Sequence, residues 1–418
     1  MAEEKRPWDL LIIGGGATGL GVAVDASSRG YRVLLVEQHD FAKATSSRST
    51  KLVHGGVRYL QQGDVSMVVE ALHERGRLWR NAPHLVKDMR FIIGNYRWWE
   101  RPFYTIGLCC YDLLAGRLGL GRSLPLSKKQ TLKELPGLLH DHLRGGVVYH
   151  DGQFDDSRMA ITLMQSAHDH GAICINYMKV TSLIKNDSGK ICGAALEDTL
   201  EGGTYEVNVK GVVNATGVYV DDIMQMDKPE SRKKVRPSQG VHIVVDAAFL
   251  GGNSALMIPK TRDGRVLFGV PWHGKAVLGT TDTPLNENSL EPKPLDEEID
   301  FILDQAGQYL THKPKRSDVL SVFAGLRPLA APTHSDSKKT KEISRNHKIY
   351  VSDSGMLTIT GGKWTTYRQM AEEAVNKVAA LIGLEPRACV TRKMQLHGYR
   401  EEVDRSVWDY VYLSLIHI

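Results

Sequence analysis

The sequence lacks the patterns that mark several classes of protein. Its five cysteines form neither a CxxC pair nor the spacing of zinc ligands, which argues against disulfide reductases and against a metal site. No stretch approaches the roughly 20 apolar residues that a membrane-spanning helix needs. The net charge of +5 is mild and the basic residues form no single run, so no nucleic-acid partner is expected.

The sequence also lacks the pattern of an export signal. Residues 1–8 are charged and run directly into an apolar strand. An odd number of cysteines then suits free thiols in a reducing compartment. We expect a cytoplasmic location, with peripheral contact to the cytoplasmic membrane left open. The mixed aromatic and basic residues 96–104 suit a membrane interface, and a buried connection explains them equally well.

What the sequence does contain is, first, a dinucleotide fingerprint. Residues 8–37 have the pattern of strand, glycine-rich turn, helix and strand, and the turn fits GxGxxG. In that pattern Gly14 permits the turn, Gly16 lets the backbone approach a pyrophosphate, and Gly19 lets the helix pack on the strand. The helix N-terminus attracts phosphate. Glu37 ends the second strand, where it would bind ribose hydroxyls.

Later segments favour a flavin over a nicotinamide. The loop 44–51 is rich in hydroxyls that could line a long cofactor, and the pair Gly55-Gly56 permits the backbone to approach a flat ring. Residues 214–217 add a second glycine-bearing strand end. A second dinucleotide fingerprint does not occur, which argues further against NAD(P)H-dependent reductases. We therefore expect FAD as the cofactor.

The order of the elements predicts the fold class. Successive short strands without helices between them occupy the middle of the chain, and residues 356–381 return to strand, glycine pair and helix. We predict an α/β plus α+β fold, in which a doubly wound, Rossmann-like FAD-binding domain carries an inserted antiparallel-sheet substrate domain. The FAD-binding domain is expected to comprise residues 8–90, 145–235 and 340–385, and the substrate or cap domain residues 91–144 and 236–339.

One long block and five shorter segments resemble a known family. Residues 45–60 (TSSRSTKLVHGGVRYL) are similar to the signature of FAD-dependent glycerol-3-phosphate dehydrogenases. Five shorter segments resemble further motifs of that family: residues 240–243, 279–283, 325–329, 343–347 and 361–368. The likeness runs from about Asp9 to Leu384 and looks closer to the mitochondrial type than to the bacterial aerobic type. Family members carry a further all-helical C-terminal domain, so we expect residues 386–418 to be its truncated start.

This resemblance implies an activity. The reaction is the oxidation of sn-glycerol 3-phosphate to dihydroxyacetone phosphate, with hydride transfer to N5 of FAD and electrons passed on to a quinone. The substrate is a phosphate dianion, which guanidinium groups bind well. Arg58, Arg327 and Arg345 match family arginines that face the substrate. Tyr59 and Thr281 are expected to contact it as well.

The same reaction needs a proton acceptor and a stabilised reduced flavin. His242 is the first candidate for the base, because an imidazole accepts a proton near neutral pH, and His54 is the alternative. Lys363, at a helix start, would stabilise the negative charge of reduced flavin. The expected catalytic set is His242, Arg327 and Lys363. The expected cofactor contacts are Gly14, Gly16, Gly19, Glu37, Thr45, Ser46, Ser47, Lys51, Leu52, His54, Gly55, Gly56, Ala215, Gly217, Gly362 and Lys363.

Three other interpretations stay open. A glycerol-phosphate oxidase would pass the electrons to O2 and form hydrogen peroxide. A flavin amine or hydroxy-acid oxidase shares the fold, because a fold alone does not fix the substrate. A non-catalytic flavin-binding protein would keep its flavin oxidised with every substrate.

Overall fold

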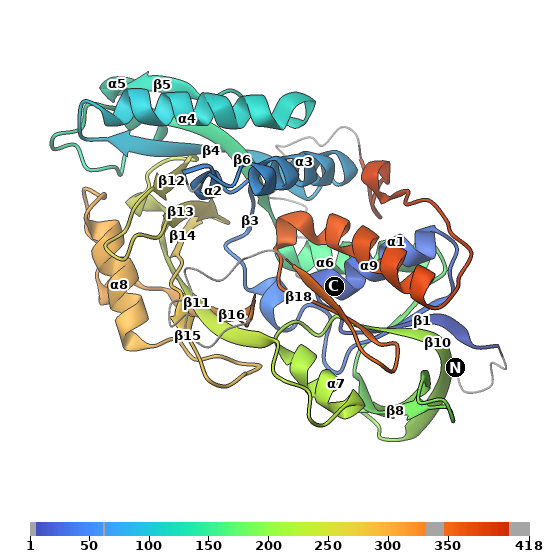
Figure 1. Cartoon of the computed structure of the whole chain (residues 1–418). Coiled ribbons are helices and arrows are strands. Elements are labelled where there is room, and N and C mark those ends of the chain that lie inside the picture. Colours follow the sequence, from blue (N-terminus) through green and yellow to red (C-terminus); the bar gives the residue numbers. More distant parts are fainter. Residues whose placement is uncertain (1–5, 62, 332–346, 401–418) are drawn as a thin grey trace.

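The computed structural model describes residues 6–61, 63–331 and 347–400, and for Arg58 and Gln61 it describes the backbone only (Figure 1). Two large sheets organise this part of the chain. The first, called here the parallel sheet, has the order β17-β18-β10-β1-β2-β7, and β8 and β9 extend it from β10. Its strands are β1 (Trp8–Ile13), β2 (Val33–Val36), β7 (Ile173–Ile175), β8 (Met178–Lys185), β9 (Ile191–Asp198), β10 (Thr204–Asn214), β17 (Lys348–Val351) and β18 (Leu357–Thr360).

Helices cover one face of the parallel sheet and strands cover the other. Figure 1 shows α1 (Ala17–Ser28), α6 (Asp156–Asp169) and α9 (Tyr367–Leu381) together on one side, and their buried residues share one apolar core. Small residues in α1 allow close packing, since a Cβ on Gly21 would lie 2.7 Å from the Tyr367 ring. On the other face, β8, β9 and α7 (Val220–Asp227) close a second core. The α/β part of the predicted fold class is confirmed, with antiparallel strands in place of a second helix layer.

The second sheet, called here the antiparallel sheet, has the order β15-β11-β14-β13-β12-β4-β6-β3, with β16 on β11 and β5 on β6. All its pairings are antiparallel except β12 with β4. Its strands are β3 (Leu52–Val53), β4 (Val86–Asn95), β5 (Leu124–Ser127), β6 (Gly145–Phe154), β11 (Val235–Asp246), β12 (Ala255–Ile258), β13 (Leu267–Trp272), β14 (Lys275–Gly279), β15 (Thr283–Pro284) and β16 (Ser321–Ala330).

Both faces of the antiparallel sheet carry helices. On one face α3 (Val65–Asn81) and α4 (Glu100–Ala115) share a core with β4 and β6, and on the other α8 (Asp296–Gly307) packs against β11 and β14. Shorter helices are α2 (Val57–Gln61) and α5 (Lys128–Glu134), and the 3-10 turns include η1 (Thr45–Ser47), η3 (Gly217–Tyr219), η7 (Trp364–Thr366) and η8 (Thr391–Lys393).

The domain boundaries stay a prediction, but three strands bear on them. β3, β6 and the start of β4 fall within the segments expected for the FAD-binding domain, yet they belong to the antiparallel sheet. Residues 386–400, expected to start a helical region, contribute the turn η8 and return to the body of the protein, where Leu396 is buried. None of the helices in the described ranges combines the length and apolar character required to cross a bilayer.

Candidate functional site

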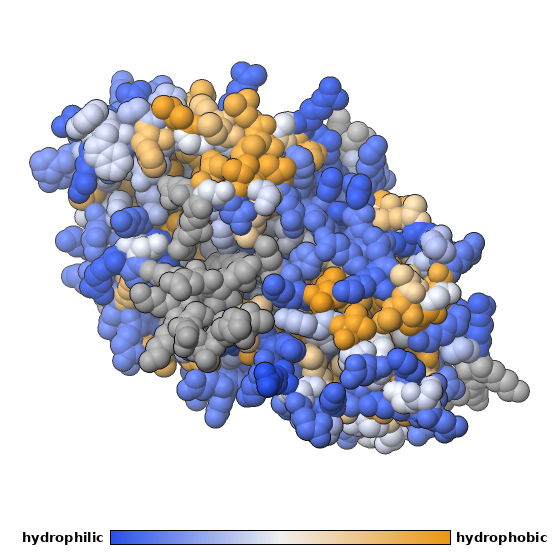
Figure 2. Space-filling model, viewed as in Figure 1, coloured by the Kyte–Doolittle hydropathy of each residue, from blue (hydrophilic) through white to orange (hydrophobic). Residues whose placement is uncertain are grey.

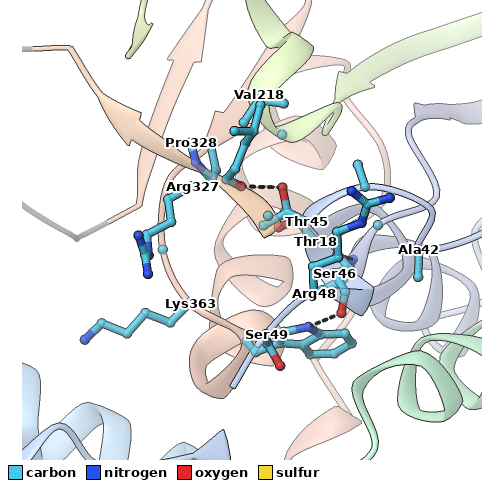
Figure 3. A pocket seen from close by; sticks show the side chains of 18 of the residues that line it. Thr18, Ala42, Thr45, Ser46, Arg48, Ser49, Val218, Arg327, Pro328 and Lys363 are labelled. Atoms are coloured by element: carbon cyan, nitrogen blue, oxygen red, sulfur yellow. Dashed lines mark hydrogen bonds between the residues drawn. The ribbon is translucent and has the colours of Figure 1, made fainter. Parts of the chain in front are cut away.

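A cavity of about 550 Å³ lies between the two sheets. On one side its lining follows the carboxyl ends of β1, β2, β10 and β18, the edge at which parallel sheets bind ligands. On the other side it is lined by residues of β11, β13 and β16. The loop that contains η1 runs between the two (Figure 3). The cavity therefore joins the dinucleotide pattern and the expected substrate residues in one space.

The glycine-rich turn after β1 leaves no room for side chains. Gly14 has a φ of +110°, and a Cβ there would lie 2.8 Å from the carbonyl oxygen of Ala215. A Cβ on Gly19 would lie 1.9 Å from the Gly14 carbonyl oxygen. At Gly16 the nearest atom would be Ser46 Oγ, at 3.1 Å. The turn thus presents bare backbone and the N-terminus of α1 to the cavity, as a pyrophosphate requires.

Glu37, directly after β2, has its carboxylate fixed by backbone amides. Its Oε2 accepts a hydrogen bond of 2.7 Å from Gly15 N, and its Oε1 accepts one of 2.9 Å from His39 N. The carboxylate therefore lies beside the glycine-rich turn and lines the cavity. This is the place expected for a group that binds ribose hydroxyls.

The hydroxyl-rich loop is tied to both sheets. Ser46 Oγ accepts from Ala17 N at 2.9 Å and so caps α1, while Thr45 Oγ1 donates to the Leu326 carbonyl at 2.6 Å (Figure 3). The indole of Trp364 donates to the Ser46 carbonyl at 2.8 Å. Sequence reasoning gave Trp364 no role, although it lies in the quoted segment 361–368.

The far end of this loop is anchored on Asp156, a buried carboxylate at the start of α6. Its Oδ2 accepts from Ser49 N and Ser49 Oγ at 3.0 and 2.6 Å, and its Oδ1 lies 2.5 Å from Lys51 Nζ. Lys51, predicted as a cofactor contact, is therefore placed in an ion pair behind the lining. Sequence reasoning gave Asp156 no part in the site.

Most residues predicted to contact the cofactor line the cavity. They are Gly14, Gly16, Glu37, Thr45, Ser46, Leu52, His54, Gly56, Ala215, Gly217, Gly362 and Lys363. The other four, Gly19, Ser47, Lys51 and Gly55, are not among the lining residues. Gly55 was expected to face a flat ring, but a Cβ there would meet Leu72 and the Tyr111 hydroxyl, each at 2.5 Å. The glycine turn, the N-terminus of α1 and Glu37 fit the phosphates and ribose of a dinucleotide.

Arg327 of β16 is the principal cation on the opposite wall. Its Nη2 lies 3.0 Å from Thr280 Oγ1, and its Nη1 lies 3.3 Å from Asp282 Oδ1. The guanidinium lies over Gly240, where a Cβ would be 2.4 Å from Nη2. Gly240 is therefore glycine because the arginine occupies the space above it. Sequence reasoning missed Thr280 and Asp282 as partners of Arg327, although both lie in the quoted 279–283 segment.

His242 of β11 is buried in its neutral form. Its Nε2 lies 2.8 Å from Thr50 Oγ1, and its ring stacks on Phe323 with centroids 4.8 Å apart. Burial, and then the positive charges of Arg327 and Lys51, lower the pKa of His242 to about 3. The imidazole is therefore uncharged at neutral pH, as a proton acceptor must be, but it is a weak base.

Thr281 lines the cavity but uses its hydroxyl inside the sheet. Its Oγ1 accepts from Val241 N at 2.9 Å and donates to Glu298 Oε1 at 2.8 Å. Glu298 is buried and also accepts from Gln239 Nε2 at 2.6 Å. The predicted contact between Thr281 and substrate stays a prediction, and the structure adds a role in holding β11.

Lys363 and Tyr59, predicted independently, meet at one end of the cavity. Lys363 Nζ lies 4.0 Å from the centroid of the Tyr59 ring and 3.4 Å from Met67 Sδ. Figure 3 shows that Lys363 and Arg327 extend toward the same side. Of the other expected arginines, Arg345 lies outside the described residues, and Arg58 is described only by its backbone in α2.

The comparisons with known proteins agree with this site. The family described as FAD dependent oxidoreductase matches residues 9–368. A protein of Caenorhabditis elegans named probable glycerol-3-phosphate dehydrogenase, mitochondrial, is 44% identical over 406 residues, which cover 94% of this chain and 56% of that protein. The rat protein named glycerol-3-phosphate dehydrogenase, mitochondrial, is 45% identical over 413 residues, or 96% of this chain and 56% of that protein.

A solved structure shows the same likeness. The glycerol-3-phosphate dehydrogenase of Bacillus halodurans complexed with FAD superposes with a TM-score of 0.77 at 34% identity, covering 99% of this chain and 72% of that one. The chain thus spans little more than half the length of the curated relatives. The resemblance expected from the sequence is confirmed, and so is FAD as the cofactor. The chain belongs to the family of FAD-dependent oxidoreductases.

Proposed function

We propose that this protein oxidises sn-glycerol 3-phosphate to dihydroxyacetone phosphate and passes the electrons to a quinone. The observation that carries the proposal is Arg327, whose guanidinium lies in the cavity shared with the dinucleotide turn. A phosphate dianion suits a planar guanidinium, which can donate two parallel hydrogen bonds. The names of the relatives, glycerol-3-phosphate dehydrogenases, support the same substrate.

Different residues of the cavity have different roles in this reaction. When bound, FAD supplies the acceptor for the hydrogen that leaves the carbon. Arg327 binds the phosphate and fixes the position of the three-carbon chain, with Arg58 and Arg345 as further expected partners. Lys363 and Tyr59, which contact each other, also line the cavity. Thr281 holds β11 in place through its hydrogen bond with Val241 N.

His242 is the proposed proton acceptor, and the substrate itself strengthens it as a base. The charge of Arg327 is one cause of its lowered pKa. A bound phosphate dianion offsets that charge, so the pKa of His242 rises when substrate enters. His242 Nδ1 has no hydrogen-bond partner among the described residues, whereas Nε2 faces Thr50.

Reduction of the bound flavin by the substrate tests the proposal. Without air, sn-glycerol 3-phosphate should bleach the visible absorbance of oxidised flavin, whereas free glycerol should not. The Arg327→Ala variant should bind FAD and fail to bleach. A flavin that stays oxidised with sn-glycerol 3-phosphate but bleaches with an amine or a hydroxy acid would overturn the substrate assignment.

The electron acceptor separates the dehydrogenase from an oxidase. With air and no added acceptor, a dehydrogenase forms little hydrogen peroxide and an oxidase forms one molecule per turnover. A soluble quinone analogue should restore turnover in the proposed enzyme. Stoichiometric peroxide would instead assign O2 as the acceptor.

The outer face of α4 is proposed to rest on an anionic membrane surface. Phe103, Ile106 and Leu113 are exposed there, and Figure 2 shows hydrophobic residues gathered over this helix. Arg97 and Arg101 are exposed at the start of the same helix and supply positive charge. Such a mixture favours the headgroup boundary of a bilayer with anionic lipids.

Vesicle co-sedimentation tests this contact. The protein should sediment with vesicles that contain phosphatidylglycerol and much less with vesicles of phosphatidylcholine alone. Ile106→Ser combined with Leu113→Ser should abolish sedimentation and leave flavin content unchanged. Equal sedimentation of the double variant would exclude α4 as the contact.

A further inference from the structure

A buried polar cluster that the proposed reaction does not use adjoins the cavity wall. Arg75 of α3, Tyr111 of α4 and Asp151 of β6 meet there, and none is more than 2% exposed. Arg75 Nη1 lies 2.6 Å from Asp151 Oδ1, and the Tyr111 hydroxyl lies 3.0 Å from both carboxylate oxygens. These three residues are called the Asp151 cluster. They join three elements that are distant in sequence.

The Asp151 cluster holds one turn of the cavity wall. The backbone N–H of Gly55 donates to Asp151 Oδ1 at 3.2 Å. The neighbours of Gly55, which are His54 and Gly56, line the cavity, and so does Asp151 itself. Gly56 has a φ of +73°, so the turn depends on a backbone conformation that few residues adopt freely. The Asp151 carboxylate therefore holds the backbone of the His54–Gly56 turn through the N–H of Gly55.

Close packing explains why the turn and the cluster act together. A Cβ on Gly55 would lie 2.5 Å from the Tyr111 hydroxyl oxygen, so the tyrosine rests directly against the backbone of the turn. Burial, together with the Asp151 carboxylate, raises the pKa of the Tyr111 hydroxyl well above its ordinary value. The hydroxyl therefore stays protonated and donates to Asp151. Arg75 also donates to the His150 carbonyl at 3.0 Å, which ties it to β6.

We propose that Asp151, held by Arg75 and Tyr111, is a positioning residue that fixes the His54–Gly56 turn against the cofactor cavity. The inference rests on the FAD dependence of the family and not on the choice of substrate. Buried carboxylates that lose a partner become costly, and a turn bonded to them shifts. Loosening the Asp151 cluster should therefore change how FAD is held before it changes any step of the reaction.

Two variants of the FAD-loaded protein test this role. Tyr111→Phe removes one donor and keeps the ring, and we expect the dissociation constant of FAD to rise on the order of tenfold. Asp151→Asn keeps the shape but leaves Arg75 without its counter-charge, and we expect a rise on the order of a hundredfold. In both variants the visible circular dichroism of bound flavin should change, because it reports the surroundings of the ring.

Tyr31→Phe is the matched control. Tyr31 is buried and its hydroxyl donates to the Glu385 carbonyl at 2.7 Å, and neither residue is among those that line the cavity. This variant should lose thermal stability to a similar degree as Tyr111→Phe, with FAD affinity and circular dichroism unchanged. Equal FAD affinity and identical circular dichroism in Tyr111→Phe and the unaltered protein would overturn the inference.

The two proposals fail in different ways. If Asp151→Asn does not fold, Tyr111→Phe decides the outcome alone. FAD affinity and circular dichroism need no substrate, so a response there with no bleaching by sn-glycerol 3-phosphate would refute the proposed function and leave Asp151 as a positioning residue. Bleaching by sn-glycerol 3-phosphate, with FAD affinity and circular dichroism unchanged in the variants, would support the proposed function and refute the role of Asp151.

Discussion

On the side of the parallel sheet, the part of the cavity wall predicted to hold the dinucleotide is a glycine turn, the N-terminus of α1 and the ends of four strands. On the side of the antiparallel sheet the wall carries functional side chains, with Arg327 in contact with Thr280 and Asp282. The first wall depends on glycines, because a Cβ on Gly14 or Gly19 would collide with a backbone carbonyl oxygen. The second needs residues that are present at fixed positions in the register of neighbouring strands.

The difference has a physical origin in what each wall binds. Phosphates and ribose are common to all dinucleotides. Amides at a helix N-terminus bind the phosphates without side-chain chemistry, and one carboxylate, that of Glu37, is expected to bind the ribose. A particular substrate requires charge and a proton acceptor in a defined arrangement. Changes to the first wall should therefore remove the cofactor, and changes to the second should remove the reaction while the cofactor stays bound.

The largest effect is expected from Gly19→Ala. The added Cβ would lie 1.9 Å from the Gly14 carbonyl oxygen, so the turn or the helix must move. Purified Gly19→Ala should carry no flavin absorbance. The control is Gly107→Ala, in the exposed helix α4, where a Cβ meets nothing within 4 Å and the change should stabilise by up to about 1 kcal/mol. Normal flavin content in Gly19→Ala would contradict a cofactor site that depends on the close packing of the glycine-rich turn.

Arg327→Ala should have the next largest effect. We expect kcat/KM for sn-glycerol 3-phosphate to fall on the order of 10³-fold, or about 4 kcal/mol, with flavin content unchanged. Arg327→Lys should recover only part of this loss, because an ammonium lacks the planar fork of donors. Loss of FAD from either variant would show that the two walls are not independent.

The pH dependence of stability should report His242. Its folded pKa is lowered to about 3, whereas an unfolded histidine titrates near 6.5, so below pH 6.5 the unfolded state binds a proton that the folded state does not. The contribution of His242 to the free energy of unfolding is therefore fully present above pH 6.5. It is lost as the pH falls toward 3, by about 1.4 kcal/mol per pH unit. His242→Gln should remove this loss. Thermal unfolding of the two proteins should therefore converge in acid, and curves that stay parallel would contradict the buried neutral imidazole.

Ser46→Ala should give the smallest effect. Its hydroxyl caps α1 by accepting from Ala17 N at 2.9 Å, and loss of such a cap costs about 1 kcal/mol. Chemical unfolding of the FAD-free protein measures this cost directly. No change in stability would mean that the hydroxyl serves the cofactor alone.

The sequence predicted the first wall far better than the second. Gly14, Gly16 and Glu37 follow a contiguous pattern whose geometry is the same in every such turn, and all three line the cavity. Lys51 was expected among the cofactor contacts, but a buried carboxylate 105 residues later in the chain takes up its charge. Sequence spacing cannot reveal that pair, because α6 packs beside the loop only in the folded chain.

For the second wall, the sequence identified the residues but not the neighbours that they contact. Resemblance to a family assigned a role to Arg327, and chemical argument assigned roles to His242 and Lys363; each lines the cavity. Only the tertiary structure decided that Arg327 lies over Gly240, that His242 is neutral between Thr50 and Phe323, and that Lys363 lies against Tyr59. Local pattern and backbone stereochemistry fix the turns that hold a dinucleotide. The charge and pKa of a side chain depend on burial and on neighbours from distant strands, and these exist only once the two sheets have packed.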